Sequence, residues 1–211
     1  MAVAQLIGGR LLTDAQASVT ALQQQKQAPL VLHLATHAYY QPDLAKVERK
    51  GDQQLVTTPQ GFAAQAGENP LLRSGIVLAG ANQPEADPDD DGYLTALEVA
   101  RLNWKGAELV VISACQSGKG DIKAGEGVYG LKRAIAVAGA RSSLLSLWNV
   151  DDLATAAFME SFYSKLKAGM ARADALKATQ KEFREHQILS WRHPYVWAAF
   201  QLSGDWSSLR W

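Results

Sequence analysis

Two stretches decide the fold of this chain: residues 31–37 (VLHLATH) and residues 108–115 (ELVVISAC). Both are largely apolar runs, which is typical of strands buried on both faces of a parallel sheet. Each ends in a chemically active side chain, an imidazole at His37 and a thiol at Cys115. The carboxyl ends of parallel strands lie along one edge of an open sheet. We therefore expect His37 and Cys115 to face the same crevice.

Further apolar runs alternate with amphipathic stretches along the rest of the chain. Besides residues 30–36 and 108–114, the runs predict strands at residues 75–79, 142–148 and 197–202. Helical spacing of apolar residues predicts helices at residues 13–25, 95–102, 128–138, 153–167 and 172–185. Gly139 and Gly169 follow two of these helices as terminators. The alternation predicts an α/β fold with loops at residues 38–73, 82–92 and 116–127.

Composition narrows the class of protein. The 211 residues suit one domain spanning 1–211, and 21 basic residues balance 21 acidic ones, which argues against nucleic acid as a partner. We find neither a secretory signal nor the run of about 18 apolar residues that a membrane span needs. The single cysteine excludes a disulfide within the chain and any zinc site with two thiolates. These features predict a cytoplasmic protein.

A histidine beside a cysteine suits nucleophilic catalysis. A free thiol has a pKa of about 8.5, and a nearby imidazole can take its proton and leave a strong nucleophile. The backbone N–H groups of Ala38 and Cys115 are the expected oxyanion donors. A lone buried cysteine is usually packing, but two strands that both end in reactive side chains favour a catalytic role. His33 is the competing base, but it lies about 13 Å back along the strand, inside the sheet.

Six segments in order resemble those of CHAT domains, which are bacterial relatives of caspases and separases. The segments read LHLATH, SGIVLAG, DGYLTALEV, LVVISACQSGKG, GEGVYGLKRAIAVAGARSSLLSLWNVDD and HPYVWAAFQLSGDW, and the match as a whole runs from about Leu6 to Trp206. The resemblance implies a caspase-like α/β/α sandwich around a mainly parallel sheet. It also implies a cysteine endopeptidase with His37 and Cys115 as its dyad, at the C-terminus of a longer protein, often behind helical repeats.

Two departures from the family pattern bear on activity. The family usually has glycine directly after the catalytic histidine, where this chain has Ala38. Family members also begin with an additional strand and helix. This chain is therefore expected to start at or inside the second strand and to lack the first, which a missing segment or a partner would supply.

Acidic residues suggest a specificity pocket. Asp151 and Asp152 follow the strand predicted at residues 142–148 and should lie at the catalytic edge. The resemblance implies that Asp152 lines a pocket for a substrate Arg or Lys. Both acids also stand just before a predicted helix, where aspartate is a preferred N-cap.

A second acidic pattern suggests a cation. Asp87, Asp89, Asp91 and Glu98 follow the spacing of a calcium-binding EF-hand loop, with Gly92 at its turn position. The segment before them reads as a strand rather than an entering helix, and the CHAT pattern predicts the same residues without a metal. Calcium is the one cofactor that the sequence suggests.

The sequence therefore predicts a cysteine endopeptidase that cleaves after Arg or Lys and is activated by a partner or by the missing segment. Its partners would be protein or peptide substrates and an activating protein, with neither nucleic acid nor membrane. Three alternatives remain open: a noncatalytic interaction or regulatory module with the same fold, an incomplete domain without activity, and a hydrolase of small amides with the same dyad.

Overall fold

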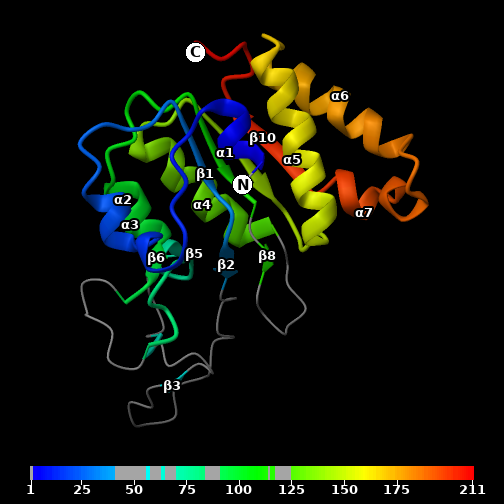
Figure 1. The fold of residues 1–211 in the computed structure, drawn as a ribbon. Coiled ribbons are helices and arrows are strands. Elements are labelled where there is room, and N and C mark those ends of the chain that lie inside the picture. Colours follow the sequence, from blue (N-terminus) through cyan, green and yellow to red (C-terminus); the bar gives the residue numbers. More distant parts are fainter. Residues whose placement is uncertain are drawn as a thin grey trace.

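A mixed sheet forms the centre of the computed structural model, which describes residues 2–40, 56–57, 63–64, 70–83, 91–113, 115–116 and 125–211. The strand order is β1 (Val31–Leu34), β7 (Leu109–Ile112), β9 (Ser142–Ser146) and β10 (Phe200–Gly204). The first three strands run parallel, and β10 is antiparallel to β9. Figure 1 shows this sheet between two groups of helices.

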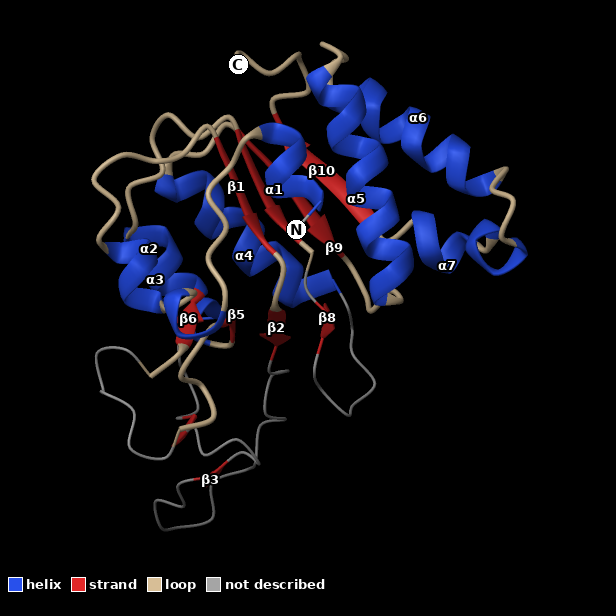
Figure 2. Cartoon of the chain, viewed as in Figure 1, coloured by secondary structure: helices blue, strands red, loops and turns tan. Residues whose placement is uncertain are grey.

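Helices cover both faces of the central sheet, as Figure 2 shows. One face packs against α2 (Val19–Gln23), α3 (Ala96–Arg101) and α4 (Gly125–Ala138), and the other against α1 (Ala2–Ile7), α5 (Asp152–Lys167), α6 (Arg172–Arg184) and α7 (Pro194–Trp197). Strand β7 serves both cores, because Val110 and Ile112 point to the first group and Leu109 and Val111 to the second. This confirms the three-layer α/β/α sandwich predicted from sequence.

A second sheet lies beyond the ends of β1 and β7. Its order is β6 (Tyr93–Thr95), β5 (Ser74–Val77), β2 (His37–Tyr40) and β8 (Cys115–Gln116). The short strands β3 (Val56–Thr57) and β4 (Ala63–Ala64) pair only with each other. Three 3-10 helices complete the described elements: η1 (Asp14–Gln16), η2 (Pro70–Leu72) and η3 (Leu189–Arg192). Among the described residues, no helix is long and apolar enough to cross a membrane.

Several elements depart from the sequence-based expectation. The chain does not start in a strand: Ala2–Ile7 is the helix α1, whose Val3, Leu6 and Ile7 pack on the core beside α5. The helix expected at residues 13–25 is interrupted, because Asp14 adopts a φ of 51° and Ser18 starts α2 by accepting from the Ala21 N–H at 3.2 Å.

The predicted loops and the last strand also differ. Residues 38–73 contain most of β2 and the whole of β3, β4 and η2, and α4 already begins at Gly125. The strand expected at residues 197–202 begins only at Phe200, because Pro194 at the first helical position starts α7. The two glycine terminators are confirmed, with φ values of 102° at Gly139 and 87° at Gly169.

An ion-pair network closes the edge of the central sheet where its parallel strands begin. Arg172 has no exposed side-chain surface and donates to Glu108, whose side chain is 10% exposed, and to the Ser207 carbonyl at 3.0 Å. Arg141 donates to Asp205 at 2.9 Å and lies 3.4 Å from Glu108. These contacts join α6, β7, β9 and the segment after β10 at the edge opposite the second sheet.

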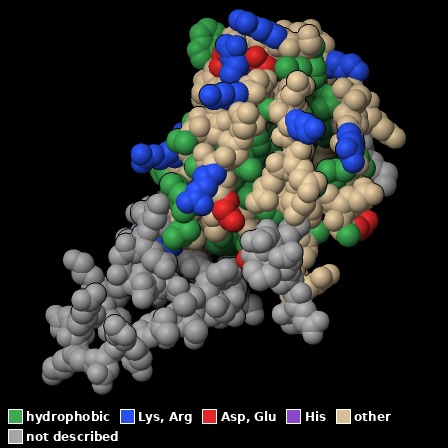
Figure 3. All heavy atoms as spheres, turned by 90° about the vertical axis from the view of Figure 1, so that its left-hand side faces the viewer, with side chains coloured by type: hydrophobic (Ala, Val, Ile, Leu, Met, Phe, Trp, Pro, Cys, Tyr) green, Lys and Arg blue, Asp and Glu red, His purple; other side chains and the backbone are tan. Residues whose placement is uncertain are grey.

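One face of the molecule shows how the charged side chains are distributed (Figure 3). On the face drawn in Figure 3, Lys and Arg side chains are scattered among apolar and neutral ones and do not form a continuous patch. This distribution agrees with the balanced composition of 21 basic and 21 acidic residues.

Candidate active site

Two parallel strands carry His37 and Cys115 out of the central sheet together. Leu34 pairs with Ile112 at the end of β1 and β7. Two residues follow on each strand, and pairing then resumes with His37 opposite Cys115 in β2 and β8. Figure 1 shows β2 and β8 side by side beyond the central sheet. The register of the central sheet therefore continues across the bend and places the two reactive residues opposite each other along the backbone.

His37 itself is exposed at the start of β2. Its strand pairs with β5 on the other side, where His37 lies opposite Val77. The Thr36 hydroxyl donates to the Val77 carbonyl and fixes the chain directly before the histidine. The Cys115 side chain lies outside the described part of the structure, so its place is given by the backbone pairing. The backbone at His37 is thus held by β5 and by the Thr36 hydroxyl, and the His37 residue is exposed.

Ala38 lies in an extended strand rather than in a conformation that only glycine adopts. Asp14 is the one non-glycine residue with a positive φ among those described. Alanine is therefore compatible with the backbone after His37, where the sequence resemblance implies glycine. Strands pair with β2 on both sides. A hydrogen bond to a neighbouring strand therefore competes with a substrate oxyanion for the Ala38 N–H. Its role as an oxyanion donor stays a prediction, as does that of Cys115.

His33 lies apart from this pair, inside the central sheet. Its Nε2 is 2.9 Å from the Ser113 Oγ, and its ring stacks on Tyr163 of α5 with centroids 5.6 Å apart. Burial lowers the pKa of His33 from 6.5 to about 4, because the apolar surroundings disfavour the charged imidazole. His33 is neutral at physiological pH, in a place where the sequence expected a non-catalytic histidine.

The two acids after β9 occupy different positions at the start of α5. Asp151 is the N-cap, and its Oδ1 accepts from the Ala154 N–H at 3.0 Å. Asp152 is the first residue of the helix, and its side chain is exposed. The structure thus assigns the capping role to Asp151. It leaves the pocket role of Asp152 as a prediction.

The suggested calcium ligands are only partly described. Asp87 and Asp89 lie outside the described residues. Asp91 accepts from the Tyr93 N–H at 2.9 Å, and Glu98 accepts from the backbone and hydroxyl of Thr95 at 2.7 Å each, closing a capping box at α3. Among the described residues, no cluster of three or more His, Cys, Asp or Glu side chains is placed to hold a metal. Asp91 and Glu98 thus have hydrogen-bond partners of their own, and calcium binding at this loop stays a prediction.

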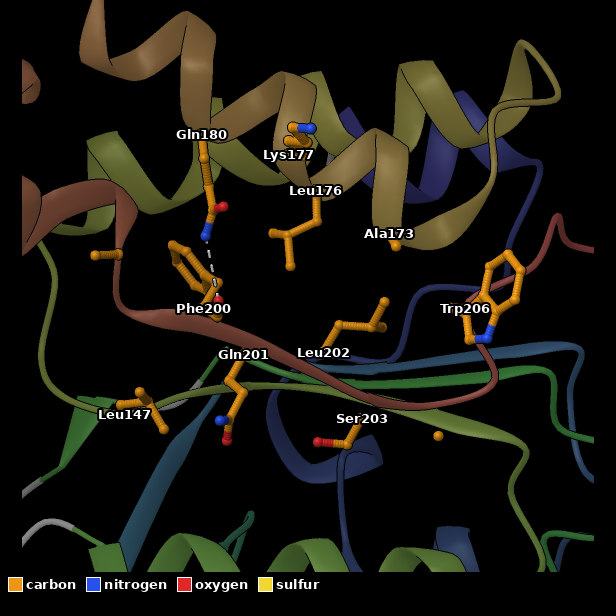
Figure 4. A pocket seen from close by; sticks show the side chains of 12 residues that line it. Leu147, Ala173, Leu176, Lys177, Gln180, Phe200, Gln201, Leu202, Ser203 and Trp206 are labelled. Carbon is orange, nitrogen blue, oxygen red and sulfur yellow. Dashed lines mark hydrogen bonds between the residues drawn. The ribbon is translucent and has the colours of Figure 1, made fainter.

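A hollow lies elsewhere, between α6 and β10, as Figure 4 shows. Leu176 and Lys177 line it from the helix, and Gln180 donates to the Phe200 carbonyl at 3.5 Å across it. Its volume is about 540 Å³, and none of its lining residues belongs to the predicted site. Strands β10 and β1 are the two outermost strands of the central sheet, on opposite sides of it. The hollow beside β10 is therefore remote from β1, the strand that leads to His37.

Sequence reasoning missed the partners that support the candidate site. It predicted a strand at residues 75–79, which is β5, but it did not predict β2, the pairing of β2 with β5, or the Ser113 hydroxyl beside His33. The two tyrosines at residues 39 and 40, a residue type that favours strands, were a weak signal for β2. The Ser113 contact had no signal, because it joins residues 80 positions apart.

Comparisons with known proteins agree with this architecture. The family model described as the CHAT domain matches residues 1–205. Human "Tetratricopeptide repeat protein 28" is 34% identical over 126 residues, which cover 60% of this chain and 5% of that protein. The mouse protein of the same name is 26% identical over 214 residues, which cover 96% of this chain and 8% of that protein. This chain thus spans a small part of the length of both relatives.

Proposed function

The chain belongs to the CHAT domain family, and from that membership we propose that it is a cysteine endopeptidase with Cys115 as nucleophile and His37 as base. The observation that carries the proposal is the backbone pairing of His37 with Cys115 in β2 and β8. The family is related to caspase-like peptidases, and the chain retains both reactive residue types at paired positions.

The chemistry follows from these two side chains. His37 takes the thiol proton, and the Cys115 sulfur forms a bond to the peptide carbonyl carbon while the C=O electron pair moves to oxygen. The tetrahedral intermediate collapses by breaking the C–N bond, and His37 gives its proton to the leaving amine. Water, deprotonated by His37, then attacks the thioester. The second tetrahedral intermediate collapses by breaking the C–S bond, the carboxylic acid leaves, and the His37 imidazolium returns its proton to the Cys115 thiolate. Backbone N–H groups near residues 38 and 115 would stabilise the two oxyanions.

The proposed specificity is for a basic residue before the cleaved bond. Asp152 begins α5 after β9, the strand beside β7 in the sheet, so it lies at the same edge as the dyad. A carboxylate there would pair with a substrate guanidinium or ammonium group. Asp151 accepts from the Ala154 N–H as the N-cap of α5, and Asp152 is the better positional match to the acid that the family resemblance implies for the pocket.

The first prediction concerns the dyad. In a fluorogenic peptide library varied before the cleaved bond, the wild type should cleave, and Cys115→Ala or His37→Ala should lower kcat by about 10³-fold or more. His193→Ala is the matched histidine control, because His193 caps α7 through Nδ1, 3.1 Å from the Tyr195 N–H. Loss of cleavage in that control, or full cleavage by Cys115→Ala, would contradict the assignment.

The second prediction concerns specificity. Asp152→Asn should reduce kcat/KM for Arg and Lys substrates by about 10- to 100-fold, since a charge-assisted contact is worth roughly 1.5–3 kcal/mol. Cleavage after neutral residues should be unchanged. Asp151→Asn is the control, because asparagine retains the cap. An equal loss for neutral substrates would assign Asp152 a structural role instead.

A noncatalytic interaction module is the second candidate. Two observations favour it: the Ala38 N–H lies in a strand flanked on both sides, and the two relatives are named for tetratricopeptide repeats. The two candidates differ in the state of the thiol, which is the only one in the chain. An activated Cys115 should react with iodoacetamide well below the usual thiol pKa of about 8.5, whereas a module should show an ordinary thiol.

A further inference from the structure

A side-chain contact joins β1 and β7 directly below the point where the strands leave the central sheet. The Nε2 of His33 lies 2.9 Å from the Ser113 Oγ, across 80 positions of sequence. Ser113 is also tied to β1 by its backbone, because its N–H donates to the Leu34 carbonyl at 3.1 Å. Ser113, the last residue described before Cys115, is therefore held at two points to β1, the strand that leads to His37.

The His33 ring is held from its other side as well. It stacks on Tyr163, with ring centroids 5.6 Å apart and planes inclined by 26°. Tyr163 has no exposed surface and belongs to the α5 core. A neutral imidazole offers one N–H and one lone pair, so Nε2 can donate to the hydroxyl or accept from it. Packing therefore sets the position of the ring, and the ring sets the position of Ser113.

Both residues lie a short, fixed distance from the proposed dyad. His33 precedes His37 by four residues, and Ser113 precedes Cys115 by two. The register at this point is the one that places His37 opposite Cys115. A displacement of one strand against the other would separate the dyad directly, and a misplacement of about 1 Å can reduce an enzymatic rate by roughly 100-fold.

We propose that His33 and Ser113 are positioning residues, whose hydrogen bond holds β1 and β7 so that His37 meets Cys115 in reacting geometry. This inference rests on the proposed function. Neither residue touches the reacting atoms; both act through the strands that lead to them. Without the His33–Ser113 hydrogen bond, His37 and Cys115 are both still present but spend less time in contact with each other.

The test uses the single thiol as a reporter. Rates of Cys115 alkylation by iodoacetamide are measured against pH, together with kcat and KM for a cleaved peptide. The variants are Ser113→Ala, His33→Phe, which keeps a ring against Tyr163, and Ser113→Thr, which keeps the hydroxyl. Ser142→Ala is the control: it removes a buried serine hydroxyl, bonded to the Glu108 carbonyl at 2.6 Å, from the opposite edge of the sheet.

If the bond positions the dyad, Ser113→Ala and His33→Phe lower kcat by about 10- to 100-fold with little change in KM. They also move the alkylation midpoint toward the free-thiol value of about 8.5. Ser113→Thr restores both quantities, and Ser142→Ala leaves both unchanged. Ser113→Ala and His33→Phe each remove a different partner of the same hydrogen bond. If one variant does not fold, the other still tests the inference.

Two results would overturn the inference, and they are distinguishable. A low wild-type midpoint that Ser113→Ala and His33→Phe do not move, with any loss confined to thermal stability, leaves the dyad intact and makes the bond merely structural. A wild-type midpoint near 8.5, with no peptide cleaved, removes the proposed function and the positioning role with it.

Discussion

Two histidines four residues apart have opposite environments. His37 is exposed at the start of β2, whereas His33 is stacked on Tyr163 and bonded to Ser113. The edge rule for parallel sheets predicted this division from sequence, because a residue deep in a strand cannot reach the edge. The contacts that enclose His33 were not predictable, since Ser113 and Tyr163 are far from it in sequence.

The buried state of His33 should make stability depend on pH. Its pKa falls from 6.5 to about 4, so between these values the unfolded chain binds a proton that the folded chain does not. Stability should be complete above pH 6.5 and fall as the pH drops toward 4, by up to about 3 kcal/mol. Urea unfolding between pH 7 and pH 4 measures this loss.

His33→Phe provides the comparison for that experiment, because phenylalanine keeps a ring and does not titrate. Glu182 and Asp205, whose pKa values are lowered in the folded chain, add their own losses in acid to both proteins. The difference between wild type and variant therefore isolates the histidine. Identical pH dependence in the two proteins would show that His33 is not the source.

At the scale of elements, the sequence predicted the core strands and long helices because their apolar spacing is local. It missed β2 because a strand of four residues with polar and aromatic side chains depends on its partners β5 and β8. It missed α1 although Val3, Leu6 and Ile7 have helical spacing, because the family resemblance suggested a strand there.

The cap of α5 gives a prediction at this scale. Asp151→Ala should lower the free energy of unfolding by about 1 kcal/mol, because the Ala154 N–H loses its acceptor. Asp151→Asn should lower it far less, since asparagine caps as well as aspartate. Thermal or urea unfolding at neutral pH measures both. Equal losses for Ala and Asn would show that charge, rather than capping, supplies the stabilisation.

At the scale of the whole molecule, the two ends of the parallel strands differ in what their side chains do. The proposed chemistry lies where β1 and β7 end, and the Arg172–Glu108 network lies where β7 and β9 begin. This division was not predictable, because Glu108, Arg172 and Asp205 are widely separated in sequence and meet only after the helices pack.

Removal of one partner of the buried pair should therefore weaken the whole fold. Glu108→Ala leaves the fully buried Arg172 without its main counter-charge and should cost about 3–5 kcal/mol of stability. Arg141→Ala is the matched control, because its side chain is 42% exposed and surface pairs contribute about 1 kcal/mol or less. Urea unfolding compares the two, and equal losses would contradict the burial argument.

The two short segments that connect the central sheet to the second sheet, from β1 to β2 and from β7 to β8, constrain how the sequence can evolve. Two residues separate Leu34 from His37, and two separate Ile112 from Cys115. An insertion in one segment alone would shift one reactive side chain by about 3.3 Å and turn it to the other face of its strand. The two connecting segments must therefore keep equal lengths: an insertion or deletion in one is compatible with catalysis only if the other changes by the same number of residues.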